Sequence, residues 1–431
     1  MSDVSLRYGE DFAVSQKPTR LSVLYLMIVE QLLPLYRDKS GQLFAGDLWH
    51  KDLLMHLEYL DHFMLASPCL QQEPPPDAKP LFVDKSQFEI IELPPQRGVL
   101  RSLLAMPLII YRLCKAIRRA DIVHSAIVGW PIPMGWVVTP LVLLFRKPLV
   151  IIVESAPWRL PRGLATGWKR RLRAGLQEYL GRWVLRNADL VICTQNEYRQ
   201  SLLGPKQAEG FVIPASWIDE KDILSQGEAG EIWEKKLSAS DSRLRILFVG
   251  RLAPEKGVLV LLEAMRQLNT ERLPISLDIL GEGPLRNECE SAASELKGTT
   301  AVNVLGTVPY GAPLFSVIRQ YDAVVVPSIT DEQPRIVFDA YSQAVPVLAS
   351  DTPGLRSCVM NGEAGLFSPP NDVSALCDLL RYTAGHRSEL RQLGLQTLTY
   401  AHTMTHQEMH RQRATLLQTM IEKRKQARRT A

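Results

Sequence analysis

The stretch RILFVGRLAPEKGVLVLLEAM, residues 245–265, decides the fold of this 431-residue chain. RILFV is a short apolar run typical of a buried strand, VLVLLEAM has the apolar period of a helix, and the loop 250–257 joins them. Glycine lets a backbone approach a ligand, a helix N-terminus offers N–H groups, and Arg251 and Lys256 add positive charge. The loop therefore suits a diphosphate, and a surface turn with two solvated cations is the alternative interpretation.

Strand and helix patterns continue to alternate on both sides of this stretch. Downstream, the apolar runs ISLDIL, AVNVL, DAVVV and VPVLA are separated by helical segments; upstream, LSVLYLMIV, FEIIEL, DIVHS, PLVIIV, DLVIC and GFVIP alternate in the same way. This alternation predicts parallel sheets wrapped by helices, and the chain is longer than one hydrophobic core usually supports. We therefore expect an α/β protein with two Rossmann-like, doubly wound domains facing a cleft.

Composition places the expected domain boundaries. Residues 1–218 form the N-terminal domain, and 219–243, which ends in the polar, serine-rich KKLSASDSR, forms a linker. Residues 244–385 form the C-terminal domain. Residues 386–431 form a helical tail without a strand pattern, for which packing back on the N-terminal domain is one arrangement.

A second polar loop, PSITDEQPRIVFDA at 327–340, again joins a strand pattern to a helix pattern. Asp331 in the loop and Asp339 in the helix are eight positions apart, so both carboxylates can approach one ligand. Carboxylates hydrogen-bond the vicinal hydroxyls of a sugar or a ribose well. The competing interpretation is structural, because Thr330 and Gln333 have capping-box spacing and Pro334 suits a first helical turn.

Together these motifs resemble the retaining nucleotide-sugar glycosyltransferases of the glycogen-synthase-like group, which are of the glycosyltransferase family 4 type with the GT-B fold. The chain has G-R-L-x-x-x-K-G at 250–257, G-x-G-P at 281–284, Gly306 after the next strand, VPVLAS at 345–350 and NGEAGL at 361–366. Each piece is common, but their order and spacing are specific. The resemblance covers the second half of the chain well and the first half loosely.

The resemblance implies a role for each matching residue. Arg251 and Lys256 would hold the nucleotide diphosphate, Asp339 the ribose hydroxyls, and Asp331 the donor sugar. The backbone near Gly306 would meet the base. The implied catalytic residues are thus Asp331, Arg251 and Lys256, and the implied donor-binding residues are Gly250, Gly306, Glu332, Gln333, Pro334, Arg335 and Asp339.

The chain departs from the family pattern in both halves. The family usually has glutamate at both ends of the interval that Asp331 and Asp339 bound here, and Glu332 lies one place off the pattern. In the first half, His124 fits a family V-H pattern, and Glu154 stands where the family often has histidine. We expect His124 and Glu154 on the acceptor side; plain packing or polar roles are the alternatives.

The implied activity is transfer of a hexosyl unit from a nucleoside-diphosphate sugar to a hydroxyl of a glycan or lipid-linked saccharide, with retention at the anomeric carbon. We expect no cofactor and no essential metal, because no Asp-x-Asp tripeptide stands near either loop. Two alternatives remain: a non-catalytic glycosyltransferase-like binding subunit, and another GT-B enzyme, which would be a sugar-nucleotide epimerase or a phosphorylase.

Basic residues gather in two segments although the net charge is only +4. Lys and Arg greatly outnumber Glu within 146–186, and a second cluster lies in the tail at 423–429. In GWKRRLRAGLQEYLGRWVLR, apolar residues recur at helical spacing beside cations, which is typical of interfacial helices: Trp168, Leu172, Leu176, Leu180, Trp183 and Val184. Packing of this stripe on the sheet is the alternative. We expect a cytoplasmic protein, peripheral on the inner face of a membrane, with an anionic membrane surface but no nucleic acid among its partners.

The six separated cysteines favour a reducing compartment, and the polar N-terminus resembles no secretory signal.

Overall fold

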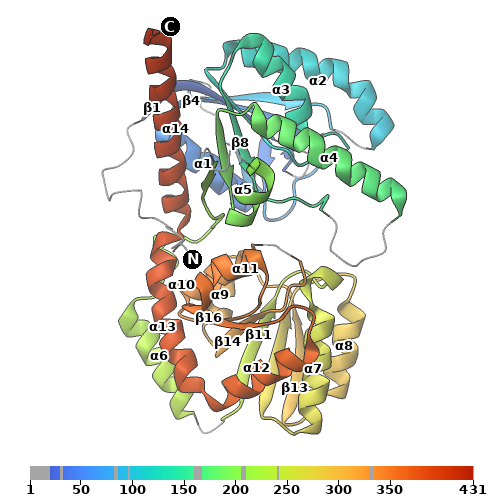
Figure 1. Cartoon of the computed structure of the whole chain (residues 1–431), viewed down its shortest axis with the longest axis vertical. Coiled ribbons are helices and arrows are strands. Elements are labelled where there is room, and N and C mark those ends of the chain that lie inside the picture. Colours follow the sequence, from blue (N-terminus) through green and yellow to red (C-terminus); the bar gives the residue numbers. More distant parts are fainter. Residues whose placement is uncertain are drawn as a thin grey trace. The chain divides into compact units, whose positions relative to one another are not determined.

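The computed structural model describes residues 20–29, 33–81, 86–95, 98–129, 131–159, 167–204, 210–239, 242–330 and 333–430. The chain divides into two compact units (Figure 1). One comprises Met1–Pro214 with Met409–Ala431, and the other comprises Ala215–Glu408. Both are α/β units with mainly parallel sheets, which confirms the expected fold class.

The second unit is built on six parallel strands in the order β13-β12-β11-β14-β15-β16. The strands are Leu244–Val249 (β11), Ile275–Leu280 (β12), Thr300–Gly306 (β13), Ala323–Val326 (β14), Val347–Ser350 (β15) and Gly365–Ser368 (β16). The order runs outward in one direction from β11 and then in the other direction from β14. This is the doubly wound order of a dinucleotide-binding domain, with its reversal point between β11 and β14.

Helices flank this sheet, and loops connect them to its strands. They are Gln226–Ser238 (α6), Val258–Thr270 (α7), Arg286–Glu295 (α8), Ala312–Ile318 (α9), Ile336–Ser342 (α10), Pro353–Cys358 (α11), Val373–Gly385 (α12) and Arg387–Thr403 (α13), with 3-10 turns at Glu220–Asp222 (η2), Pro254–Lys256 (η3) and Met360–Gly362 (η4). Strands β14 and β15 are buried along their whole length, because helices cover them on both sides.

The stretch 219–243, which we interpreted as a linker, contains η2 and α6 within the second unit. Ser225 and Glu228 form a capping box that starts α6. Trp233 on α6 is fully buried, and its Nε1 donates to the carbonyl of Ala344 at 2.8 Å. The polar composition of this stretch therefore did not indicate helix α6, which Trp233 anchors to the second unit.

The first unit is built on a ten-stranded sheet with the order β10-β9-β8-β7-β1-β4-β2-β3-β5, in which β6 also pairs with β4. The strands are Leu21–Ile28 (β1), Leu35–Arg37 (β2), Leu43–Ala45 (β3), Leu60–Gln71 (β4), Lys79–Pro80 (β5), Phe88–Leu93 (β6), Ile122–Ser125 (β7), Leu149–Val153 (β8), Leu190–Cys193 (β9) and Gly210–Val212 (β10). Only β2–β3 and β3–β5 pair antiparallel among the described strands.

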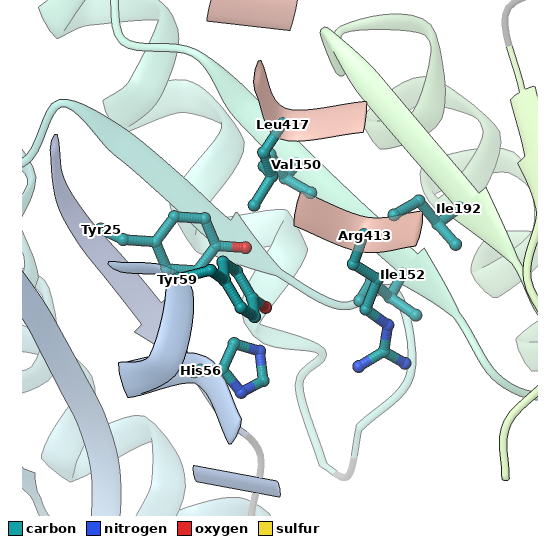
Figure 2. A pocket seen from close by; sticks show the side chains of 8 residues that line it. All are labelled: Tyr25, His56, Tyr59, Val150, Ile152, Ile192, Arg413 and Leu417. Atoms are coloured by element: carbon teal, nitrogen blue, oxygen red, sulfur yellow. The ribbon is translucent and has the colours of Figure 1, made fainter. Parts of the chain in front are cut away.

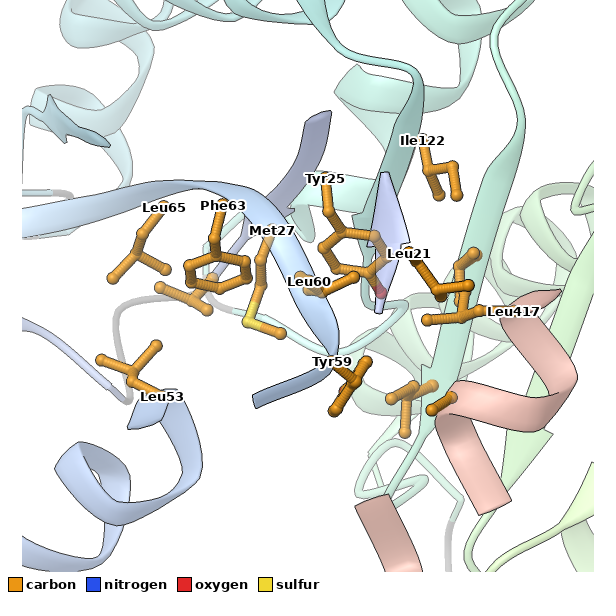
Figure 3. Packing of buried hydrophobic residues seen from close by; sticks show 14 of the residues in the cluster. Leu21, Tyr25, Met27, Leu53, Tyr59, Leu60, Phe63, Leu65, Ile122 and Leu417 are labelled. Carbon is orange, nitrogen blue, oxygen red and sulfur yellow. The ribbon is translucent and has the colours of Figure 1, made fainter. Parts of the chain in front are cut away.

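Successive residues of β1 point to opposite faces of this sheet, and each face carries its own core. Leu26 packs with Leu113 of α2, Val138 of α3 and other residues of the helices on that face. Tyr25 packs on the other face with residues of α1 and α14, as Figure 3 shows for part of the cluster. The helices are Asp47–Tyr59 (α1), Val99–Arg119 (α2), Met134–Phe145 (α3), Trp168–Arg186 (α4), Asn196–Leu203 (α5) and His406–Thr430 (α14).

The most apolar stretch of the sequence, 137–153, is divided between α3 and β8. The two elements meet at Arg146, whose backbone is left-handed with φ 53° and ends α3. In the described part of the chain, no helix combines the length and apolarity needed to cross a bilayer.

Candidate active site

Both polar loops singled out in the sequence follow strands that flank the reversal point of the second sheet. The loop 250–257 follows β11, and the loop that leads to α10 follows β14. In open α/β sheets, ligands bind outside the carboxyl ends of the strands at such a point. The topology therefore brings the predicted phosphate loop and the predicted sugar loop to one edge of one sheet.

Gly257 lies where these two loops pack against each other. Its φ is 71°, and a Cβ atom built on it would stand 1.8 Å from the carbonyl oxygen of Pro327. The amide of Ile329 also donates to the carbonyl of Glu255 at 3.0 Å. Only glycine fits such a position, so its absent side chain lets the two loops pack backbone to backbone.

The loops after β12 and β13 join the same edge. Cβ atoms built on Gly281 and Gly283 would stand 1.8 Å from the oxygen of Gly250 and 2.4 Å from that of Leu252. The amide of Leu252 donates to Glu282 at 2.9 Å, and the amide of Gly281 donates to the carbonyl of Gly306 at 2.7 Å. Four consecutive loops thus form one hydrogen-bonded rim, which includes the predicted residues Gly250 and Gly306.

The predicted phosphate-binding cations lie on this rim. Arg251 has a 64% exposed side chain and forms an ion pair with Glu255. Lys256 is half-buried at the end of η3. Helix α7 begins at the next residue after Gly257, and no side chain caps its first turn. The N–H groups of that turn and two cations therefore lie on one short loop, an arrangement suited to an anion.

Asp339 lies four residues into α10 and is only 4% exposed. The Tyr310 hydroxyl donates to its Oδ1 at 2.9 Å. Burial raises the pKa of Asp339 to about 7, although the Tyr310 hydrogen bond and the charge of Arg335 act in the opposite direction. Burial and the nearby Asp339 raise the pKa of Tyr310 as well. The site thus holds a carboxyl group whose charge changes near neutral pH.

The remaining predicted residues surround the start of α10. Asp331 and Glu332 lie outside the described residues. Gln333 and Pro334 are half-buried, and Arg335 is exposed with its guanidinium 5.0 Å from the ring centroid of Trp217.

The capping interpretation of this loop does not agree with the structure. Helix α10 begins only at Ile336, and its N-cap residue, Arg335, makes no side-chain cap. Thr330 therefore does not start the helix, and its Oγ1 is buried without a hydrogen-bond partner in the described residues.

His124 and Glu154, the predicted acceptor-side residues, belong to the first unit. His124 ends the pairing of β7 with β1, is 9% exposed, and its Nδ1 lacks a hydrogen-bond partner among the described residues. Burial, with smaller effects from His56 and Arg413, lowers its pKa to about 3. Glu154 is exposed directly after β8. His124 is therefore a neutral imidazole at physiological pH.

Sequence reasoning missed Tyr310 and Trp217. Tyr310 follows Gly306 by four residues, in the loop after β13, and could have been noted as a polar aromatic residue at the carboxyl end of a predicted strand. Trp217 has no such signal, because its contact with Arg335 depends on how a loop near the start of the second unit folds.

Comparison with known proteins gives a consistent result. Residues 61–215 match the family model described as "Glycosyl transferase 4-like domain", and residues 230–394 match "Glycosyl transferases group 1". The chain is 25% identical over 275 residues to a glycogen synthase of Mycobacterium tuberculosis, which covers 61% of this chain and 60% of that protein. It is 26% identical over 225 residues to the lipopolysaccharide 1,2-N-acetylglucosaminetransferase of Salmonella typhimurium, covering 46% of this chain and 58% of that one. The chain thus spans about three fifths of the length of these relatives.

A solved structure shares the fold over nearly the whole chain. HepE of Anabaena, crystallised in complex with UDP, superposes with a TM-score of 0.63 at 15% identity and covers 93% of this chain and 100% of its own.

Proposed function

Because the chain belongs to the group 1 glycosyltransferases with a family 4-like first domain and the GT-B fold, we propose that it transfers a hexosyl unit from a nucleoside-diphosphate sugar. The acceptor in this proposal is a hydroxyl group of a glycan or a lipid-linked saccharide, and the anomeric configuration is retained. One observation carries the proposal: the two loops that match the family motifs flank the reversal point of one sheet and hydrogen-bond to each other there.

The proposed chemistry breaks the bond between the anomeric carbon and the diphosphate oxygen. Positive charge develops on the sugar ring, and negative charge develops on the departing diphosphate. Arg251 and Lys256 would stabilise that negative charge, with the first turn of α7. Arg251 would leave Glu255 for the diphosphate, at small cost because an exposed ion pair contributes only about 0–1 kcal/mol.

Asp339 would accept hydrogen bonds from the ribose hydroxyls, and Asp331 would contact the donor sugar, with Glu332 as the alternative acid. His124 and Glu154 would lie toward the acceptor. The proposal includes no cofactor and no essential metal, so chelation by EDTA should leave the rate unchanged. It places the protein in the cytoplasm, with an anionic membrane surface as a further partner.

The first test is a donor screen with site variants. Wild-type protein should be stabilised against heat by one or a few nucleoside-diphosphate sugars, and the UDP sugars are the first choice because HepE was solved with UDP. Arg251→Ala and Lys256→Ala should each weaken transition-state binding by about 1.5–3 kcal/mol, which lowers kcat/KM roughly ten- to 150-fold. Lys297→Ala is the matched control, since Lys297 is an exposed lysine of the same unit outside these loops. If Arg251→Ala and Lys256→Ala both kept the kcat/KM of the Lys297→Ala control, their assignment to the diphosphate would be refuted.

A second set of variants separates the acids. Asp339→Asn should mainly raise the donor KM, and Asp331→Asn should mainly lower kcat. If Glu332→Gln is the damaging change and Asp331→Asn is silent, the contact to the donor sugar belongs to Glu332.

Product analysis separates the remaining functions. NMR of the product should show the donor's anomeric configuration, and an inverted product would exclude retention. Binding of a sugar nucleotide without transfer to any acceptor or to water would instead indicate a binding subunit, and a new sugar nucleotide epimer would indicate an epimerase.

A further inference from the structure

An apolar and basic face lies on helices α2, α3 and α4 of the first unit. Most of the large apolar side chains that are exposed in the described part of the chain lie on these three helices. Helix α3 contacts both α2 and α4, and in Figure 1 the first turns of α2 and α4 point to the same side of the unit. Exposed apolar side chains gathered on three neighbouring helices are uncommon on a soluble monomer and are typical of a docking site.

The apolar stripe of α2 adds to the apolar face that already serves the core. Leu100, Leu104 and Leu108 recur every four residues and are 72%, 74% and 44% exposed. Ile109 and Leu113 are fully buried on another side of the same helix. Helix α2 therefore has two apolar faces: one packs on the sheet, as in other surface helices, and the other faces water.

Of the two interpretations of the apolar stripe on α4, packing on the sheet holds for the second half of the helix and exposure at an interface for the first half. Its buried residues, Gly181, Val184 and Leu185, all lie in the second half. Trp168 and Leu172, in the first half, are 69% and 67% exposed. The second half therefore packs on the unit, whereas the first half presents its apolar side chains to solvent.

The charge of this face is positive. Helix α2 contains five arginines or lysines and no acid, and Arg101 and Lys115 among them are exposed. Helix α4 has no acid before Glu178, which pairs with Arg159 at 3.0 Å and Arg182 at 2.8 Å. Lys169 and Arg170 are exposed beside Trp168. The complementary surface is anionic.

We propose that this face docks the protein reversibly on a bilayer that contains anionic phospholipids, with the first half of α4 lying in the headgroup region. Trp168 and the leucines would enter the interface, and the cations would stay at headgroup depth on their aliphatic stems. A protein partner fits less well, because the cores of protein interfaces are depleted of charged residues, whereas the first half of α4 places several cations directly beside its exposed apolar side chains. The inference specifies the membrane association within the proposed function and does not depend on the donor site.

Vesicle flotation with the full chain tests this inference. The protein should float with phosphatidylcholine vesicles that contain phosphatidylglycerol, and not with phosphatidylcholine alone. High salt should weaken binding, because surface charges are screened. Leu172→Ser with Leu176→Ser, and separately Lys169→Glu with Arg170→Glu, should each lower the partition coefficient at least about tenfold.

Matched controls lie outside the face. Leu33 and Leu54 of the first unit are 42% and 48% exposed and belong to none of the three helices, so their double change to serine should not affect flotation. Lys235→Glu with Lys297→Glu makes the same charge change at two exposed lysines outside the face. Because the substituted residues are exposed, every variant should keep the wild-type Tm.

Three results would overturn the inference: no flotation at low salt, equal losses in the face and control variants, or self-association that the α4 serine variant abolishes. Sugar-nucleotide binding by the same variants is measured without vesicles. Retained donor binding with no flotation would refute only the docking face, and flotation without donor binding would refute only the proposed transferase.

Discussion

Two opposing effects set the pKa of Asp339. Burial disfavours its charge, whereas the Tyr310 hydroxyl at 2.9 Å and the nearby Arg335 favour it, and the result is a pKa of about 7. In the unfolded chain the same group ionises near pH 4, so the folded state binds the proton more tightly. The contribution of Asp339 to stability is therefore complete below pH 4 and is lost as the pH rises through 7. Ribose hydroxyls, as donors, would compensate the charge that burial disfavours.

Donor affinity should consequently rise with pH. We expect the association constant of a UDP sugar to increase between pH 6 and 8 and to level off above, since the diphosphate diester itself does not titrate there. Tyr310→Phe should shift this midpoint upward by about one to two pH units, because it removes a hydrogen bond of about 1.5–3 kcal/mol to the ionised form. Asp339→Asn should remove the dependence.

Isothermal titration across this pH range measures the effect. Tyr321→Phe is the matched control, because its hydroxyl donates to Asp278 at 2.5 Å elsewhere in the unit. A flat profile for the wild type, or a downward shift for Tyr310→Phe, would show that Asp339 does not bind the donor as its anion.

The residues of the candidate site could be predicted only where a sequence motif contains them. Arg251, Lys256 and Asp339 stand at fixed spacings within continuous strand-loop-helix stretches. Tyr310 could not be paired with Asp339 from sequence, because the two approach each other only when the loop after β13 packs near α10. The pKa of Asp339 was unpredictable for the same reason, since burial belongs to the tertiary structure.

At the scale of elements, Gly257 connects two loops of the rim. Gly257→Ala would put a methyl group 1.8 Å from the Pro327 oxygen at a φ of 71°. We expect a loss of at least about 2 kcal/mol in the free energy of unfolding, from backbone strain and from the separation of the loops, and a weaker affinity for the donor.

Chemical denaturation with donor titration checks this expectation. Gly227→Ala is the control, because no atom lies within 4 Å of its Cβ position in the first turn of α6. That change should be neutral or should stabilise by up to about 1 kcal/mol, since alanine is the better helix former. Equal stability and donor affinity in Gly257→Ala and wild type would mean that the two loops do not depend on their contact.

Elements were predictable where turns separate them. All the apolar runs named from the sequence contain strands of the structure, whereas the short strands β2, β3, β5 and β16 and the long strand β4 were missed. Helix α1 ends at Tyr59 and β4 begins at Leu60, so no glycine, proline or asparagine marks the change. The periodicity of HLEYLDHFMLA is mixed for the same reason, and only pairing with β1 and β6 makes its second part a strand.

At the scale of the whole molecule, the first unit is discontinuous in sequence. Its last helix, α14, returns after the complete second unit, and Met409, Leu417 and Met420 join the core that includes Tyr25. Figure 3 shows Leu417 and Tyr25 in this cluster. Polar groups accompany them: His410 Nε2 lies 3.1 Å from Asp52 Oδ1. Figure 2 shows Arg413 beside His56, Tyr59 and Tyr25 around a small pocket. An apolar helix stripe in a sequence does not reveal which sheet it covers, so this arrangement could not be derived from the tail alone.

Truncation after Glu408 should therefore unfold the first unit and spare the second. Loss of Met409, Leu416, Leu417 and Met420 removes about 1.5–3 kcal/mol of burial each, and Asp52 loses two buried partners. That total is comparable with the whole stability of a domain, about 5–15 kcal/mol. Truncation after Glu422 is the control, because it keeps every buried side chain of α14. Limited proteolysis should degrade 20–214 only in the shorter chain, while residues 215–408 stay resistant and still bind the sugar nucleotide. If 20–214 resisted proteolysis equally in both truncations, the sheet of the first unit would be stable without its last helix, and α14 would serve another purpose.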